Sequence, residues 1–378
     1  MHPSPYSCSC RVDELMSQGV LLIEEVHREI SATKGRKVRR IIKGMAIAIS
    51  FSLIAVPTAR ADDSDSDSKS AREPVTVSVP IRTIDTPDKS GQNGILVVRV
   101  GRAAPISVMV DTGIVGLVLF GKPAGLKPTG KRTTTEIRGS KIPGAIFTAP
   151  VTIGGVTTTQ PVTISVVNTS NPYIQQWKNR GISGIIGLGT GDGGNMTNIL
   201  KSMPGSLGLR WSIHFKRNIG TQKGRPGALV LGAEPPVDPT MSFRLPYVSQ
   251  DINGANNWDD HQADGCWTFG VLREQCVPTW FDSGFTLMRV LGRDFSRVPD
   301  TSTNLVKPGT RVKLAAAGSA FFGHKFIAGM TGSRNLVRLI PRGQPTINTG
   351  NSFYFDYTLT YDLAVGTVSL GDSNLKGN

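Results

Sequence analysis

The chain has 378 residues, of which 39% are hydrophobic, and it carries a formal net charge of +14 at pH 7. This length suffices for two domains with sizeable cores, and the hydrophobic content excludes a wholly disordered chain. The basic charge favours anionic partners, but no zinc-finger spacing, RNP-like aromatic stretch or basic helix accompanies it. We therefore expect no nucleic-acid partner.

The first predicted element is an export signal at about residues 34–61. A basic start at 34–40 precedes an apolar segment at 45–56, and Ala59-Arg60-Ala61 supplies a small-residue cleavage site. The apolar segment is too short to span a bilayer comfortably. Arg39-Arg40 also fits a twin-arginine signal, so the export route stays open. We expect a periplasmic or secreted protein whose mature form has no membrane span.

A leader and then a series of strands follow the signal. Residues 62–70 alternate acidic residues with serines and have nothing to bury, which is typical of a flexible segment. From Pro74 onward, runs rich in branched residues are bounded by Gly, Pro or Asn and predict a mostly β chain. The expected strands are 75–84, 95–100, 106–110, 145–153, 162–167, 228–231, 241–248, 267–272, 311–315, 353–361 and 365–370. Short helices are expected only at 196–203 and 290–295.

Two of the four cysteines would be exported, because Cys8 and Cys10 precede the signal. The exported compartment permits disulfides, so we expect a bridge between Cys266 and Cys276 that closes a short loop. These cysteines and His261 match no common zinc-ligand spacing. We therefore expect no metal site.

One motif occurs twice among the expected strands. The segment VMVDTGIVGLVLF at 108–120 contains Asp111 as its single ionisable side chain, and TWFDSGFTLM at 279–288 repeats the pattern around Asp282. A lone D-T-G is most simply a turn whose Asp hydrogen-bonds its own backbone, with Gly113 in an unusual conformation. The paired copies argue against that interpretation, because burying an unpaired charge is costly. They predict two lobes of similar design.

Two such loops have a definite chemical use. Two carboxylates that share one proton can hydrolyse a peptide bond without a metal, because their repulsion keeps one ionised as a base and the other protonated as an acid. Gly113 and Gly284 would let backbone amides approach the carboxylates closely. The hydroxyls of Thr112 and Ser283 could bond across to the opposing loop. The repeated motif thus predicts a paired-carboxylate site.

These motifs resemble those of the pepsin-type, two-lobed aspartic peptidases over about residues 74–375. The matching segments are the catalytic loops at 111–113 and 282–284, the IIGLG segment at 185–189 that threads behind the first loop, the end of the first lobe at 227–232, and the closing strands at 353–370. The resemblance implies an all-β, bilobal acid-protease fold, with two pseudo-symmetric β-barrel-like lobes and a central cleft. It also implies a monomeric aspartic endopeptidase that acts on a peptide or protein substrate and needs no cofactor.

The family's site residues can be carried over by position. The resemblance makes Asp111 and Asp282 the catalytic pair, supported by the loop residues Thr112, Gly113, Ser283 and Gly284. The hairpin that closes over substrate in the family falls at 135–144 here. Its candidate substrate-binding residues are Glu136, Arg138 and Gly139.

Three departures from the family pattern bear on activity. The Ser or Thr that follows each family motif is Ile114 or Phe285 here, so the carboxylates lose hydroxyl donors and the pKa of the acidic member should rise, moving activity toward neutral pH. Arg138 or a neighbour, together with Val118, replaces the Tyr–Trp pair of the hairpin. The second threading segment contains the polar Asn348. An inactive pepsin-like binding or inhibitor module is therefore the alternative function.

The predicted organisation has four parts. They are an N-terminal extension with the export signal at 1–61, a flexible leader at 62–73, an N-terminal lobe with the first loop at 74–237, and a C-terminal lobe with the second loop at 238–378.

Overall fold

The structure is a computed structural model. It describes residues 76–87, 91–137, 139–217, 226–251, 254–319, 323–329 and 335–372. All of them lie in the second of the two compact units into which the chain divides, Met1–Lys69 and Ser70–Asn378. The expected export signal, the whole of the expected leader at 62–73 and Arg138 lie outside the described residues. Within the described ranges, no helix is long and apolar enough to cross a membrane.

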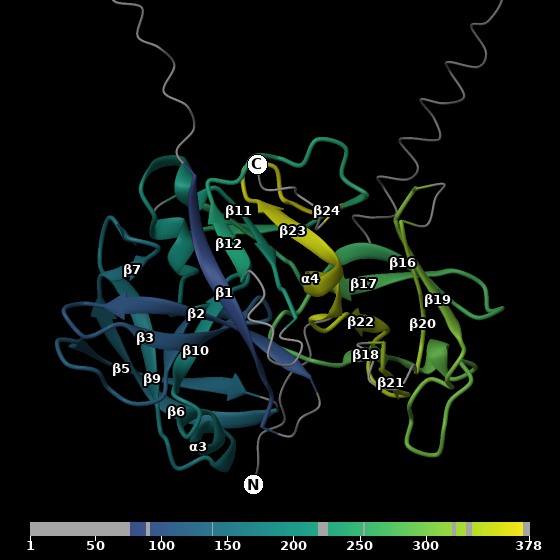
Figure 1. The fold of residues 1–378 in the computed structure, drawn as a ribbon, viewed down its shortest axis with the longest axis horizontal. Coiled ribbons are helices and arrows are strands. Elements are labelled where there is room, and N and C mark those ends of the chain that lie inside the picture. Colours follow the sequence, from purple (N-terminus) through teal and green to yellow (C-terminus); the bar gives the residue numbers. More distant parts are fainter. Residues whose placement is uncertain are drawn as a thin grey trace, which may run out of the picture. The chain divides into compact units, whose positions relative to one another are not determined.

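Strands make up most of the described residues and form two large sheets (Figure 1). The larger sheet contains β1 (Val77–Asp85), β2 (Gln92–Val100), β3 (Ile106–Asp111), β4 (Val115–Leu119), β5 (Lys127–Ile137), β6 (Ser140–Ala149), β7 (Val151–Ile153), β8 (Val156–Thr157), β9 (Val162–Val167), β10 (Ile182–Leu188), β11 (Arg210–His214), β12 (Gly227–Leu231), β13 (Met241–Arg244), β23 (Tyr357–Asp362) and β24 (Thr367–Asp372). The smaller sheet contains β16 (Ala263–Phe269), β17 (Gln275–Trp280), β18 (Met288–Leu291), β19 (Arg311–Ala316), β20 (His324–Ile327), β21 (Val337–Ile340) and β22 (Thr346–Asn348).

The remaining elements are short. They are the β14–β15 ribbon (Tyr247–Gln250 and Asn256–Trp258), the helices α3 (Pro172–Lys178) and α4 (Ser352–Asp356), and 3₁₀ turns at Ile199–Ser202, Gly205–Gly208 and Arg293–Phe295. Asn171 begins α3, because its side chain accepts hydrogen bonds from the first backbone N–H groups of the helix.

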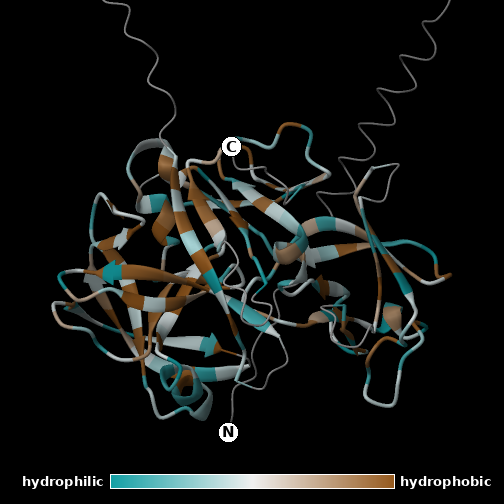
Figure 2. Cartoon of the chain, viewed as in Figure 1, coloured by the Kyte–Doolittle hydropathy of each residue, from teal (hydrophilic) through white to brown (hydrophobic). Residues whose placement is uncertain are grey.

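Hydrophobic patterning explains the strands. Along β1, Val79, Ile81 and Thr83 are buried and alternate with more exposed residues, as in a strand with one face on the core. In contrast, β10 is buried along nearly its whole length because its residues pack into two apolar clusters, Ile186 and Leu188 into one and Ile182 and Ile185 into the other. Hydrophobic residues follow the strands in both sheets (Figure 2). One continuous cluster of buried residues draws on both sheets.

One end of the larger sheet joins two parts of the chain. Its strand order there is β13-β24-β23-β11-β12-β1, and the pairing of β11 with β23 joins three strands that precede residue 238 to three strands that follow it. Trp211 on β11 stacks on Tyr361 of β23, with ring centroids 5.9 Å apart. The all-β, bilobal fold class is confirmed, whereas the residue boundary between the lobes stays a prediction.

A three-strand arrangement occurs once in each sheet. The first copy places β10 parallel to β3 and antiparallel to β4, and the second places β22 parallel to β17 and antiparallel to β18. Ile185 of β10 lies opposite Met109, and Asn348 of β22 lies opposite Trp280. Met109 and Trp280 each stand two positions before the Asp of their loop, so Ile185 and Asn348 occupy equivalent positions.

Some expected elements were wrong. The expected strand at 353–361 begins as the helix α4, because burial of Phe353 and Tyr354 overrides the strand propensity of an aromatic run. The expected helix at 290–295 is the end of β18 followed by one 3₁₀ turn. The expected helix at 196–203 is reduced to the 3₁₀ turn at Ile199–Ser202.

Candidate functional site

Two loops, each at the end of a buried strand, carry the paired Asp residues. Asp111 ends β3, and Asp282 follows β17 by two positions. The two side chains hydrogen-bond to each other. Asp282 is only 6% exposed, and Asp111 is partly exposed. The fold therefore brings together two carboxyl groups that lie far apart in the sequence.

Both loops require glycine because the opposing Asp side chain leaves no room for a Cβ atom. A Cβ atom at Gly113 would lie 2.8 Å from Asp282 Oδ1, and one at Gly284 would collide with the carboxyl group of Asp111. Neither glycine has a positive φ. The interpretation that Gly113 supplies an unusual backbone conformation is therefore wrong. As expected, the backbone N–H of each glycine donates to the Asp of its own loop, at 2.7 Å for Gly113 and 2.9 Å for Gly284.

Thr112 and Ser283 join the loops by reciprocal hydrogen bonds. The backbone N–H of Thr112 donates to Ser283 Oγ, and the backbone N–H of Ser283 donates to Thr112 Oγ1, both at 2.9 Å. Ser283 Oγ also donates to the carbonyl of Val110 at 3.3 Å. Both side chains are fully buried. This crossing fixes the separation of the two loops and, with it, that of the carboxyl groups.

A buried hydroxyl network lies beneath the loops. The carbonyl oxygen of Phe281 accepts from Thr112 Oγ1 at 2.7 Å and from the Tyr354 hydroxyl at 2.9 Å. The Tyr354 and Tyr361 hydroxyls are 2.6 Å apart. Burial raises the pKa of Tyr354, so its hydroxyl stays neutral and able to donate. Sequence reasoning did not find these tyrosines because their only signal was an aromatic run read as a strand.

Asp282 has a donor that the sequence did not predict. Asn348 Nδ2 donates to Asp282 Oδ2 at 2.7 Å. Asp282 therefore has an amide donor in addition to the backbone N–H of its own loop, although the hydroxyl that usually follows the motif is replaced by Phe285. Asn348 of β22, which the sequence analysis identified only as a departure from the family pattern, supplies this hydrogen bond.

The electrostatics of the pair are asymmetric. Burial raises the pKa of Asp111 well above its ordinary value, and the neighbouring charge of Asp282 raises it further. Burial also raises the pKa of Asp282, but hydrogen bonds from Asn348 and Gly284 and the charge of Arg289 oppose that rise. Of the two groups, Asp282 is therefore the one better stabilised as a carboxylate.

A cavity of about 510 Å³ has Gly113, the glycine of the first Asp loop, among its lining residues. Its walls include residues of β5, the loop after β10 and the segment after β15. Three of its charged lining residues form what we call the acidic wall: Glu136, Asp192 and Asp259. Neither lysine nor arginine is among the described residues that line it. The cavity is therefore a negatively charged recess in a strongly basic protein.

Asp260 and His261 complete one side of this cavity. Thr190 N donates to Asp260 Oδ2 at 2.7 Å, and Asp260 is 6% exposed. Burial raises the pKa of Asp260 to about 7, against the effect of the Thr190 hydrogen bonds. The His261 ring lies 3.8 Å from that of Trp280, and burial lowers its pKa. The sequence analysis did not identify either residue as part of the candidate site.

The expected substrate hairpin is formed by β5 and β6, which pair up to Ile137 and Ser140. Glu136 lies on the cavity wall, whereas the tip residue Gly139 has φ of 77° and nothing within 4 Å of its Cβ position. Arg138 lies outside the described residues. Val118 lines the cavity and is 2% exposed. Substrate binding by the hairpin stays a prediction.

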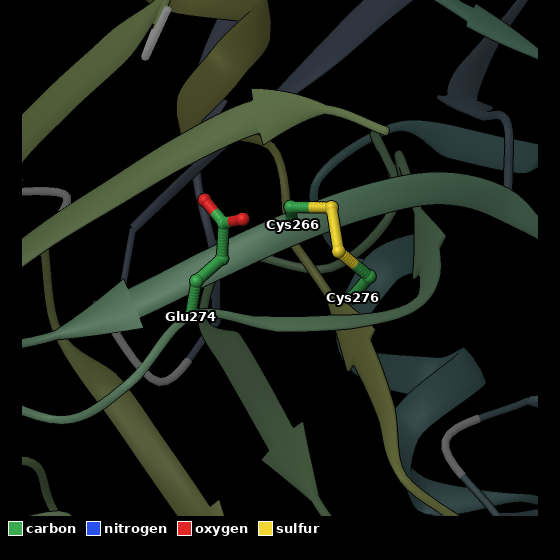
Figure 3. Close-up of side chains that lie close together, drawn as sticks. All are labelled: Cys266, Glu274 and Cys276. Carbon is green, nitrogen blue, oxygen red and sulfur yellow. A yellow bond between two sulfur atoms is a disulfide. The ribbon is translucent and has the colours of Figure 1, made fainter. Parts of the chain in front are cut away.

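Cys266 and Cys276 form the expected disulfide (Figure 3). They lie directly opposite each other on β16 and β17. The carboxylate of Glu274 is close enough for a three-residue ligand set. Because the two sulfurs are bonded to each other, they do not offer thiolates to a metal while the disulfide is intact.

A larger cavity of about 1070 Å³ lies elsewhere, between β1, β2 and the β7–β8 hairpin. Its described lining residues are mainly apolar and include no acidic residue. Its ionisable lining residues are the basic Arg82, Arg99, Lys216 and Arg217, so it lacks the paired carboxyl groups that distinguish the site at Asp111 and Asp282.

Comparison with known proteins agrees with this architecture. A family model described as the PE-PGRS C-terminal aspartyl peptidase-like domain matches residues 77–215. No curated protein matches the chain in sequence. The crystal structure of the aspartic proteinase from Irpex lacteus matches with a TM-score of 0.53 at 16% sequence identity, over 80% of this chain and 99% of that one. Residues 77–215 are thus similar to an aspartyl peptidase-like domain, and the chain shares the fold of a pepsin-like aspartic proteinase.

Proposed function

We propose that the protein is an aspartic endopeptidase that hydrolyses peptide bonds with a water activated by Asp111 and Asp282. The observation that carries this proposal is the contact between the two carboxyl groups, which the crossed hydrogen bonds of Thr112 and Ser283 hold in place. A buried pair of like-charged groups destabilises a fold, and such pairs are characteristic of functional sites.

The arrangement fits acid–base catalysis. Two carboxyl groups in contact hold one proton between them, because both cannot be ionised at this separation. The ionised member removes a proton from water as it attacks the peptide carbonyl, and the protonated member donates to the carbonyl oxygen. The cavity at Gly113 offers a place for the side chains of a bound peptide next to the pair.

The proposal is tested by cleavage of denatured casein. Wild type should release peptides, a pepstatin-type inhibitor should block the release, and Asp111→Asn and Asp282→Asn should each abolish it. Asp264→Asn is the matched control, because Asp264 is exposed and lies on β16 opposite Pro278, in neither loop. Activity that survived either substitution in the pair would refute the mechanism.

A second candidate is a pepsin-like binding or inhibitor module without hydrolysis. The β5 residues that face the cavity are Thr133, Thr134, Thr135 and Glu136, with no aromatic residue among them. This favours a changed mode of peptide contact. Wild type that binds the pepstatin-type inhibitor, yet cleaves no substrate at any pH, would support this alternative.

A further inference from the structure

The orientation of Asn348 is fixed from both sides. The backbone N–H of Gly350 donates to Asn348 Oδ1 at 2.9 Å, which leaves Nδ2 to donate to Asp282 Oδ2 at 2.7 Å. The side chain is 5% exposed. A flipped amide would place two donors against each other at Gly350 and two acceptors against each other at Asp282. The buried amide therefore acts as a dedicated donor to one carboxyl group of the pair.

The first loop has no equivalent donor. In β10, the position that corresponds to Asn348 holds Ile185, which is 1% exposed and belongs to an apolar cluster with Met109 and Val118. Within the described residues, the backbone donor to Asp111 is Gly113 alone. The pseudo-symmetry of the two loops is thus broken at the one position that can supply an amide to a carboxylate.

The other charged and titratable groups around Asp282 either stabilise its carboxylate, as Asn348 does, or stay uncharged. Arg289 on β18 lies opposite Asn348 in register, and its positive charge stabilises the carboxylate of Asp282. Tyr354 on α4 and Tyr361 on β23 both keep their protons, because burial raises the pKa of each. The remaining neighbour is Asp111, which shares the proton.

We propose that Asn348 is a positioning residue that keeps Asp282 as the carboxylate and leaves the shared proton on Asp111. This inference rests on the proposed peptidase function and assigns the two roles that the function leaves open. Asp282 takes a proton from water while the water oxygen bonds to the carbonyl carbon, and Asp111 gives its proton to the carbonyl oxygen.

The same assignment balances the second half of the reaction. The C–N bond breaks as the proton on Asp282 moves to the leaving nitrogen. One hydroxyl of the tetrahedral intermediate returns its proton to Asp111 as the product carboxyl group forms. The pair is thereby restored with Asp282 ionised and Asp111 protonated.

The first test measures the carboxyl groups themselves. In protein labelled with ¹³C at the Asp side-chain carboxyl, Asn348→Ile should raise the lower of the two pKa values of the pair by about one unit or more, because a donor to the ionised form is lost. Isoleucine is the residue at the equivalent position in the first lobe. Asn348→Ala, which removes the same donor without adding volume, provides the test if the isoleucine variant does not fold.

Asn198→Leu is the matched control. Asn198 is 1% exposed and donates to the carbonyls of Leu188 and Gly189, so its loss disturbs a buried amide that bonds to no carboxyl group. An unchanged lower pKa in the Asn348 variants, or an equal rise in the Asn198 control, would overturn the inference.

The second test uses denatured casein. The acidic limb of kcat/KM against pH should move upward in the Asn348 variants by the same amount as the lower pKa, because kcat/KM reports ionisations of the free enzyme. An acidic limb that stayed in place would overturn the role of Asn348 in catalysis. If wild type cleaved no casein at any pH, the proposed function would fail, while the carboxyl titration would still decide whether Asn348 holds Asp282 ionised.

Discussion

Replacement of Thr112 by valine isolates the hydrogen bonds that join the two loops. Valine is close to threonine in size and shape, so the main effect of the change is the loss of a buried hydroxyl and its hydrogen bonds. The hydroxyl accepts from the backbone N–H of Ser283 at 2.9 Å and donates to the carbonyl of Phe281 at 2.7 Å. The loss of these two hydrogen bonds contributes unequally to the expected decrease in the free energy of unfolding.

The size of the expected loss of stability depends on which hydrogen-bond partner of the Thr112 hydroxyl is left unsatisfied. The carbonyl of Phe281 retains the hydroxyls of Tyr354 and Tyr361, at 2.9 and 3.4 Å. The buried N–H of Ser283 loses its acceptor, and an unsatisfied buried donor costs about 1–3 kcal/mol. We therefore expect Thr112→Val to lower the free energy of unfolding by about 2 kcal/mol. Cleavage of casein should fall as well, because the separation of the carboxyl groups is no longer fixed.

Thr158→Val is the matched control for urea unfolding and for cleavage. Thr158 is 6% exposed, accepts from the backbone N–H of Val151 at 3.2 Å and donates to the carbonyl of Gln160 at 2.8 Å. Its loss should lower stability without changing cleavage by the folded protein. The reasoning would be refuted if Thr112→Val cost less than about 0.5 kcal/mol, the range of ordinary surface substitutions, or if both variants lost cleavage equally.

Three further predictions concern pH, redox state and charge. The pKa of Asp260 is about 7 in the folded protein and about 3.9 in an unfolded chain. Between these two pH values the folded state binds one proton more than the unfolded state. The free energy of unfolding therefore falls as pH rises from about 4 to about 7. Asp260→Asn should flatten that part of the pH dependence in urea unfolding; an identical slope in wild type and variant would contradict the burial argument. Reduction of the bridge between Cys266 and Cys276, which are 10 positions apart, should lower the free energy of unfolding by about 2–3 kcal/mol; an unchanged urea midpoint would show that the bridge does not constrain the unfolded chain. The acidic wall should favour peptides with Lys or Arg near the cleaved bond. In a peptide library, Glu136→Gln should reduce this preference, whereas the control Glu274→Gln, on the disulfide loop, should leave it unchanged. An unaltered preference in Glu136→Gln would show that the acidic wall does not select the substrate.

Short-range sequence patterns determined the fold class and the two loops. An apolar strand followed by Asp, a hydroxyl residue and Gly is a local signal, and its repetition around Asp111 and Asp282 indicated two similar lobes before any contact was known. The disulfide was predicted because only Cys266 and Cys276 follow the expected export signal. These features follow from residue type and order, which the sequence contains in full.

The sequence also allowed the roles of Thr112 and Ser283 to be predicted, but not the reason for the glycines. The hydroxyls bond across the loops as expected. Gly113 and Gly284 are required because the opposing carboxyl group occupies the space of a side chain, and no pattern in the sequence reports what lies across a loop.

Only the tertiary structure decided what surrounds the two Asp residues. Asn348 lies 66 positions from Asp282, yet parallel pairing of β17 and β22 places its amide against that carboxyl group. Folding also brings the acidic wall together from three separate segments of the chain. The physical reason is that the pKa of a carboxyl group depends on burial and on donors that approach through space, and long-range strand pairing sets both.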